Sequence, residues 1–210
     1  MVALVIGLTG GIASGKSAAT AAFERRGIVV ADADLAAHAA VARGSEGLAE
    51  VVAAFGPEAL AADGTLDRAA MRRRIFADPD ARARLEAILH PRIRLVLQTA
   101  CEAASGPYAV AAIPLLAEGG RDRYPWLHRV LVIDVPVDVQ LARLLRRDGI
   151  DEALATKMIG AQASREARLG IADDVFVNDD SLEALDARIG ALDARYRALA
   201  AARDEAAGGR

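Results

Sequence analysis

Five short apolar runs are spread along the chain, and longer stretches with helical patterning separate them. The runs cover residues 2–6, 28–31, 108–113, 129–135 and 173–178. Runs of this length that are rich in branched side chains are typical of strands buried on both faces of a sheet. Helices are expected over 15–26, after the first strand, and from 180 to about 203, after the last. This alternation predicts an α/β fold in which helices flank a five-stranded parallel sheet.

The stretch from 35 to 104 differs, because strand patterns disappear and helical patterns repeat. The expected helices are 35–41, 46–55, 68–76, 79–89 and 92–104. Asp34, Asp67 and Asp78 are suited to cap three of them. His90-Pro91 is expected to end one helix, because a residue before proline avoids the helical conformation. The sequence therefore predicts an all-helical insertion between the second and third strands.

Residues 10–17, GGIASGKS, follow the first strand and match the phosphate-binding P-loop pattern G-x-x-x-x-G-K-[ST]. Glycines let successive backbone N–H groups face one anion, and the helix that follows adds its positive end. Lys16 would reach the β- and γ-phosphates of a nucleotide, and the Ser17 hydroxyl would bind Mg²⁺. A chance glycine-rich turn is the alternative, but the strand before it and the helix after it favour a P-loop. The predicted nucleotide-binding residues of the loop are Gly10, Gly11, Ile12, Ala13, Ser14, Gly15, Lys16 and Ser17.

Polar residues follow several predicted strands, at the edge of the sheet where ligands of open α/β folds bind. Asp32 and Asp34 leave the second strand, and only one of them is expected to face the nucleotide, because alternate residues point to opposite sides. Glu118 follows the third strand and is either an acid near Mg²⁺ or substrate, or an exposed helix residue. Asn178 ends the fifth strand on the ligand side and is a candidate nucleotide contact.

Arginines gather in short helices expected after the fourth strand. Arg143 and Arg147 are four residues apart and share a helix face, as do Arg165 and Arg168, which are three apart. This pattern predicts a mobile lid that folds over phosphates. The expected division of the chain is a nucleotide-binding core at 1–34, 105–138 and 170–210, a substrate-binding insertion at 35–104 and a lid at 139–169.

Composition narrows the possible partners. The chain has 210 residues, is 53% hydrophobic and carries a net charge of −3, which argues against a nucleic-acid binder that works by overall charge. Cys101 is the only cysteine, so no disulfide can form within the chain, which fits a reducing compartment such as the cytoplasm. No apolar run is long enough to span a membrane. A monomer is expected. Eight arginines of the insertion form either a solvated helix face or a pocket for an anionic substrate: Arg68, Arg72, Arg73, Arg74, Arg82, Arg84, Arg92 and Arg94.

Seven stretches, taken in this order, resemble the dephospho-coenzyme A kinase family. They are GLTGG (7–11), DAD (32–34), ADGTL (62–66), LHP (89–91), IPLLAE (113–118), QLARLLRRD (140–148) and QASREAR (162–168). The likeness covers nearly the whole chain, and the conjunction is far more specific than a P-loop alone.

The resemblance implies transfer of the γ-phosphoryl group of ATP to the ribose 3′-hydroxyl of dephospho-CoA, the last step of coenzyme A biosynthesis. Asp34 corresponds to the family's base, and Lys16 and Ser17 keep their P-loop roles. By the same likeness, Arg143, Arg147 and Arg165 correspond to lid contacts with ATP phosphates, and His90, Leu115 and Glu118 to positions near the substrate. The family usually has glycine at position 13 and a bulkier apolar residue at 117. If φ at Ala13 is positive, alanine costs about 1 kcal/mol or more there.

Three other functions compete with this one. The nearest is a P-loop kinase for another small molecule, such as a nucleoside monophosphate or shikimate. A non-catalytic nucleotide-binding module would bind ATP without turnover, which the intact Lys16, Ser17 and Asp34 argue against. A GTPase switch would need D-x-x-G and N-K-x-D, and neither motif occurs in the chain.

Overall fold

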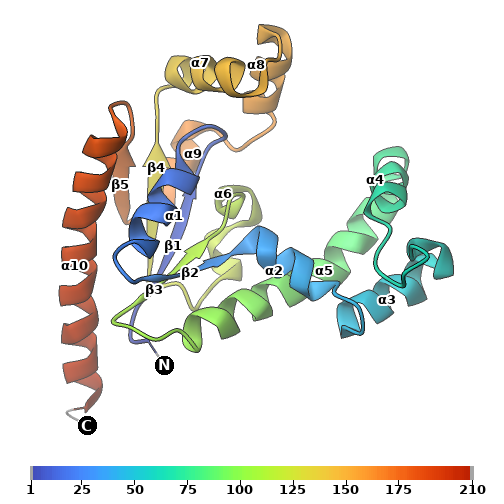
Figure 1. The fold of residues 1–210 in the computed structure, drawn as a ribbon, viewed down its shortest axis with the longest axis horizontal. Coiled ribbons are helices and arrows are strands. Elements are labelled where there is room, and N and C mark those ends of the chain that lie inside the picture. The colour runs from blue at the N-terminus through green and yellow to red at the C-terminus, as the bar shows by residue number, and fades with distance from the viewer. Residues whose placement is uncertain (1, 209–210) are drawn as a thin grey trace. The chain divides into compact units, whose positions relative to one another are not determined.

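The computed structural model describes residues 2–208 and contains a five-stranded sheet with the strand order β2-β3-β1-β4-β5 (Figure 1). The strands are β1 (Val5–Gly10), β2 (Val29–Asp32), β3 (Ala109–Ala112), β4 (Arg129–Asp134) and β5 (Asp174–Val177). Central β1 runs parallel to β3 and β4, and β4 runs parallel to β5. The predicted five-stranded parallel α/β sheet is confirmed. The first strand lies later than expected and ends at Gly10, so it leads directly into the P-loop.

Helices connect and flank the strands. They are α1 (Lys16–Glu24), α2 (Ala33–Ala40), α3 (Glu46–Phe55), α4 (Arg68–Ala77), α5 (Pro79–Glu102), α6 (Leu116–Gly119), α7 (Val137–Asp148), α8 (Glu152–Gly160), α9 (Arg165–Gly170) and α10 (Leu182–Gly208), with 3₁₀ turns at Pro57–Ala59 and Arg121–Arg123. The chain forms two compact units. One contains Met1–Ala31 and Cys101–Arg210, and the other contains Asp32–Ala100.

The core of the first unit lies where α1 and α10 pack together against the sheet. All six residues of β1 are buried, as expected for a central strand. Phe23, Tyr108 and Tyr196 form an aromatic cluster, with ring centroids 5.6 to 6.5 Å apart. The Tyr108 hydroxyl donates to Asp193 at 2.8 Å, so the polar end of this buried ring is satisfied.

The second unit is helical, with its own small core. Val51, Phe55, Met71 and Leu85 pack together there. Its expected caps are present, because the Asp67 carboxylate accepts from the N–H of Ala70 and the Asp78 carboxylate accepts from the N–H groups of Asp80 and Ala81. Each of these hydrogen bonds satisfies a backbone donor that a helix start leaves unpaired.

The expected helix break at His90-Pro91 is wrong, because α5 continues through Pro91. Proline removes one backbone hydrogen bond, the one that the carbonyl of Ala87 would accept. Both Ala87 and Pro91 are exposed, so water can satisfy that carbonyl. Leu85 and Leu97 are buried on either side of the proline, and their burial favours one continuous helix over two.

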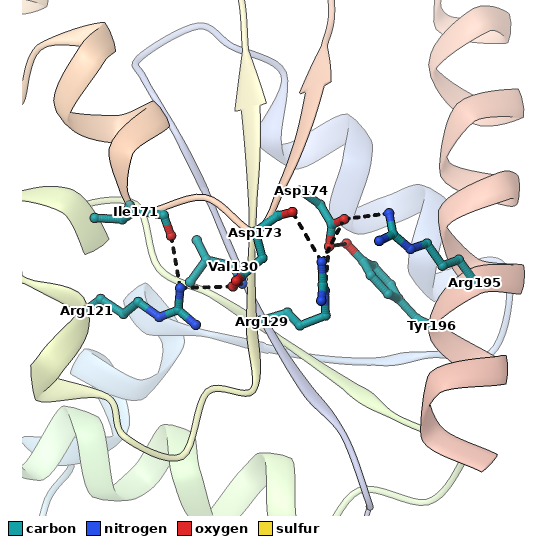
Figure 2. A network of polar contacts seen from close by, with 8 residues as sticks. All are labelled: Arg121, Arg129, Val130, Ile171, Asp173, Asp174, Arg195 and Tyr196. Carbon is teal, nitrogen blue, oxygen red and sulfur yellow. Dashed lines mark hydrogen bonds and ion pairs between the residues drawn. The ribbon is translucent and has the colours of Figure 1, made fainter. Parts of the chain in front are cut away.

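A polar network holds the first residues of β4 and β5 at the end of the sheet opposite the P-loop (Figure 2). The Asp174 side chain, 4% exposed, accepts hydrogen bonds from Arg129 Nε at 2.8 Å, Arg195 Nη1 at 2.8 Å and the Tyr196 hydroxyl at 3.0 Å. The neighbouring Asp173 carboxylate accepts from the Val130 N–H and pairs with Arg121. Burial by itself would raise the pKa of Asp174, but the hydrogen bonds and charges of these partners outweigh it and hold the pKa below its usual value.

Candidate functional site

The P-loop joins the end of β1 to the start of α1. Lys16 bends back over it, and its ammonium donates to the carbonyls of Gly10 at 2.7 Å and Gly11 at 2.9 Å. Within residues 2–208, the backbone N–H groups of Ala13, Gly15 and Ser17 have no protein acceptor. These donors lie at the N-terminus of α1, whose dipole favours an anion. The arrangement suits the phosphates of a nucleotide.

Asn178 fixes the second half of the loop. Its Nδ2 donates to the Ser14 carbonyl at 2.8 Å, and its own N–H donates to the Asp134 carbonyl at 2.8 Å. The Asn178 amide lies so close to Gly15 that a Cβ there would stand 2.2 Å from Nδ2. Gly15 also has φ +94°, which favours glycine. The side chain predicted to contact nucleotide thus also holds the loop in place, through the Ser14 carbonyl.

Ala13 has φ +57°, and it is the only non-glycine residue with positive φ among the described residues. The left-handed conformation brings Cβ close to the following carbonyl oxygen, which costs an alanine roughly 1–2 kcal/mol. The strain expected for a positive φ is therefore present in the loop.

Replacing Ala13 by glycine is expected to raise the free energy of unfolding by about 1 kcal/mol, because the relief of strain exceeds the extra entropy of glycine in the unfolded chain. Thermal unfolding should then shift upward by roughly 2–4 °C. Ala21→Gly is the matched control: Ala21 lies inside α1, so the same substitution should destabilise by about 1 kcal/mol. A melting temperature that does not rise in Ala13→Gly would contradict the strain.

The helices after β4 reach the P-loop through two glutamines. Ile12 donates its N–H to Gln162 Oε1 at 2.6 Å and accepts at its carbonyl from Gln140 Nε2 at 2.6 Å. Arg168, 6% exposed, donates to the Ala163 carbonyl, and Glu118 Oε1 accepts from the Ala163 N–H at 2.9 Å. Glu118 is an exposed residue of α6, and its hydrogen bond connects α6 to the segment just before α9.

The predicted phosphate-binding arginines have different surroundings. Arg143 makes no hydrogen bond or ion pair within the described residues. Arg147 pairs with Asp148 at 2.6 Å, and this hydrogen bond raises the pKa of the arginine. Arg165 donates to both oxygens of Asp134 at 2.6 to 3.0 Å, which raises its pKa in the same way. Asp134, 3% exposed, ends β4; sequence reasoning missed it, although a carboxylate at the end of an apolar strand was a usable signal.

The two aspartates after the second strand divide their roles. The Asp32 carboxylate caps α2 by accepting from the N–H groups of Asp34 at 2.7 Å and Leu35 at 3.2 Å. The expectation that Asp34 is the cap is therefore wrong, because α2 begins two residues earlier than predicted. The Asp34 carboxylate lies exposed in the first turn and has no partner among residues 2–208.

The other residues expected near the substrate, His90 and Leu115, are exposed. His90 lies on α5, and Leu115, 56% exposed, precedes α6. Within the arginine cluster of the insertion, Arg74 and Arg84 lie over the Phe55 ring, and Arg92 pairs with Glu50. The cluster is therefore partly engaged in packing.

Few side chains in the described part of the chain are placed to coordinate a metal ion. Within residues 2–208, no group of three or more His, Cys, Asp or Glu side chains could hold a metal ion. The Ser17 hydroxyl, exposed at the start of α1, is a hard oxygen ligand of the kind that Mg²⁺ accepts beside phosphate oxygens and water. Cys101 is buried, and burial raises the pKa of its thiol to about 12, so it is no nucleophile.

Comparisons with known proteins agree over nearly the whole chain. The family described as dephospho-CoA kinase matches residues 4–184. A dephospho-CoA kinase from Xanthomonas oryzae pv. oryzae is 57% identical over 92% of this chain and 96% of that protein. The structure of a dephospho-CoA kinase from Campylobacter jejuni has a TM-score of 0.69 and 25% identity, over 91% of this chain and 96% of that one.

A shikimate kinase from Bacteroides thetaiotaomicron, 17% identical with a TM-score of 0.54 over 90% of this chain and 97% of that one, shares the fold. None of the helices between residues 2 and 208 combines the length and apolarity that crossing a membrane requires.

Proposed function

This chain belongs to the dephospho-CoA kinase family, and we propose that it transfers the γ-phosphoryl group of ATP to the ribose 3′-hydroxyl of dephospho-CoA, giving ADP and coenzyme A. The observation that carries this proposal is the P-loop, in which Lys16 donates to a loop carbonyl and three N–H groups have no protein acceptor within residues 2–208, in a chain that matches the family from residue 4 to residue 184.

The loop supplies the ATP half of the site. The N–H groups of Ala13, Gly15 and Ser17 would hold phosphate oxygens, and Lys16 would exchange its loop carbonyls for the β- and γ-phosphates. Ser17 would hold Mg²⁺, which, when bound, neutralises charge on the phosphates. The transition state of phosphoryl transfer is loose and spreads charge over the γ-oxygens, so positioning and charge neutralisation account for most of the rate.

The arginines after β4 would lie on a mobile lid and would add positive charge around the phosphates, beside Lys16 and Mg²⁺. Arg143 has no partner to give up among residues 2–208, and it is the first choice for a phosphate contact. Arg147 and Arg165 would have to exchange the carboxylates of Asp148 and Asp134 for phosphate oxygens. Bidentate arginine geometry suits either partner.

Asp34 would act at the acceptor. Its carboxylate lies in the first turn of α2 and is free of the capping role that Asp32 takes. A carboxylate is a weak base toward an alkanol, so its work would be to orient the 3′-hydroxyl and accept its proton late. His90, Leu115 and Glu118 would lie near dephospho-CoA. We further propose that the protein is a cytoplasmic monomer with no nucleic-acid partner.

A coupled assay of ADP release tests the function. ATP, Mg²⁺ and dephospho-CoA are expected to give ADP in step with acceptor, and phosphorus NMR of the product should show a new phosphomonoester. Shikimate and nucleoside monophosphates, offered as alternative acceptors, should give background rates. ADP release that does not depend on dephospho-CoA would overturn the proposal, and ATP binding with no turnover on any acceptor would favour a non-catalytic module.

A further inference from the structure

We propose that Gln140 and Gln162 are positioning residues of the phosphoryl transfer, which hold the backbone of Ile12 and thereby set the shape of the P-loop. We call these two side chains, with the Ile12 peptide groups, the glutamine clamp. The inference deepens the proposed function and rests on it for the reaction that the clamp serves.

The clamp grips one residue from two directions. Gln162 Oε1 accepts from the Ile12 N–H, and Gln140 Nε2 donates to the Ile12 carbonyl, both at 2.6 Å. Fixing the N–H and the carbonyl of one residue fixes the orientation of the peptide groups on both sides of it. The next residue is Ala13, which is held at φ +57°. The clamp therefore acts where the loop takes its strained turn.

Gly11 of the P-loop leaves room for the side chains of Gln140 and Arg168. A Cβ at Gly11 would stand 2.5 Å from Gln140 Nε2 and 3.1 Å from Arg168 Nη2. Glycine at this position therefore provides the space that Gln140 and Arg168 occupy. Gln140 lies near the start of α7, and Gln162 lies between α8 and α9. The segment formed by α7 and α8 is therefore bonded to Ile12 at its beginning and just after its end.

Fold stability does not explain Gln140. The side chain is 1% exposed, and its Oε1 has no hydrogen-bond partner within the described residues. A buried acceptor without a partner generally costs more free energy than a single hydrogen bond, such as the one that Gln140 donates, contributes in return. The amide is better explained by what its donor does, which is to orient the Ile12 carbonyl.

The clamp also selects which loop donors face an anion. Because Gln162 engages the Ile12 N–H, that donor is not available to an anion, whereas the N–H groups of Ala13, Gly15 and Ser17 have no protein acceptor within the described residues. Without the clamp, the Ile12 peptide groups can rotate and move this array relative to the phosphates. A displacement of about 1 Å at a reacting centre can cost about 10²-fold in rate.

Methionine variants test the inference, since methionine resembles glutamine in length and lacks the amide. Gln140→Met and Gln162→Met are expected to lower kcat at saturating ATP by about 10- to 10²-fold, with KM for dephospho-CoA within about twofold. The melting temperature should stay within about 3 °C of the wild type, which separates positioning from loss of fold. A kcat within about twofold of the wild type in both variants would overturn the clamp, as would a fall in melting temperature large enough to explain the lost activity.

Three further variants sharpen the result. Gln162→Glu keeps the acceptor, so its kcat should recover while the added negative charge raises KM for ATP; a kcat as low as that of Gln162→Met counts against the clamp. The double methionine variant should lose less than the product of the two single losses, because both act on one residue. Glu205→Met, a change on the exposed surface of α10, should leave kcat unchanged.

A binding measurement separates failure of the clamp from failure of the proposed function. Calorimetric titration with ATP needs no acceptor, and Gln140→Met should weaken ATP binding several-fold relative to Glu205→Met, a change on the exposed surface of α10. If the wild type fails to turn over dephospho-CoA, the proposed function is wrong and this titration still decides the clamp. Equal ATP affinity in the two variants would overturn it.

Discussion

Replacing Asp34 by asparagine is expected to lower kcat about 10²- to 10³-fold and to leave KM for ATP within about twofold. General acid–base groups typically contribute about 10²- to 10⁴-fold, and asparagine retains the shape of the side chain while losing its ability to take a proton. ATP binding should change little, because the loop and Lys16 carry it. The measurement is steady-state ADP release with each substrate varied in turn.

Asp32→Asn is a control two residues away that removes the same charge. Asparagine caps helices about as well as aspartate, so α2 should stay intact and kcat should stay near that of the wild type. Full turnover in Asp34→Asn would remove Asp34 from the reaction. An equal loss in both variants would mean that net charge near the site, and not a base at position 34, controls the rate.

Replacing Asp174 by asparagine is expected to lower the free energy of unfolding by about 2–3 kcal/mol. The buried carboxylate is the common partner of Arg129, Arg195 and Tyr196, and its loss leaves their donors poorly satisfied at the start of two strands (Figure 2). The estimate stays below that for a fully buried pair, because the side chains of Arg129 and Arg195 are 26% and 55% exposed. Urea unfolding at neutral pH measures the change, and Asp204→Asn, on the exposed surface of α10, should change stability by less than about 0.5 kcal/mol.

The contribution of Asp174 to the free energy of unfolding should decrease at low pH. Its pKa is lower in the folded protein than in the unfolded chain, so its ionised form stabilises the fold above about pH 4, the unfolded value. That contribution is lost as the pH falls through the folded pKa. The difference in unfolding free energy between wild type and Asp174→Asn should be constant from about pH 6 to 8 and shrink below about pH 4. A difference that is the same at pH 3 and pH 7 would show that the charge of Asp174 is not what stabilises the network.

Local patterns determined the class of fold and the position of the loop. The apolar runs 108–113 and 129–135 gave β3 and β4 within two residues, because a buried parallel strand needs a short continuous apolar segment. The helix 46–55 was predicted to the residue, since Gly56 and Pro57 end it, and in the structure the Ser45 side chain caps its start. The P-loop was readable because its glycines, Lys16 and Ser17 lie within eight consecutive positions. Each of these features depends on neighbours in the sequence.

Only the tertiary structure decided how the loop is held. Ile12 and Gln162 are 150 residues apart, and Ser14 and Asn178 are 164 apart, so no local preference could pair them. The pairing of Arg165 with Asp134 likewise depends on where α9 lies beside β4. The positive φ of Ala13 runs against the preference of alanine and persists because the surrounding contacts determine the loop. The continuation of α5 through Pro91 also ran against local preference, since burial on both sides of the proline outweighed the lost hydrogen bond. The sequence alone thus identified a phosphate-binding loop, and long-range contacts decided its shape.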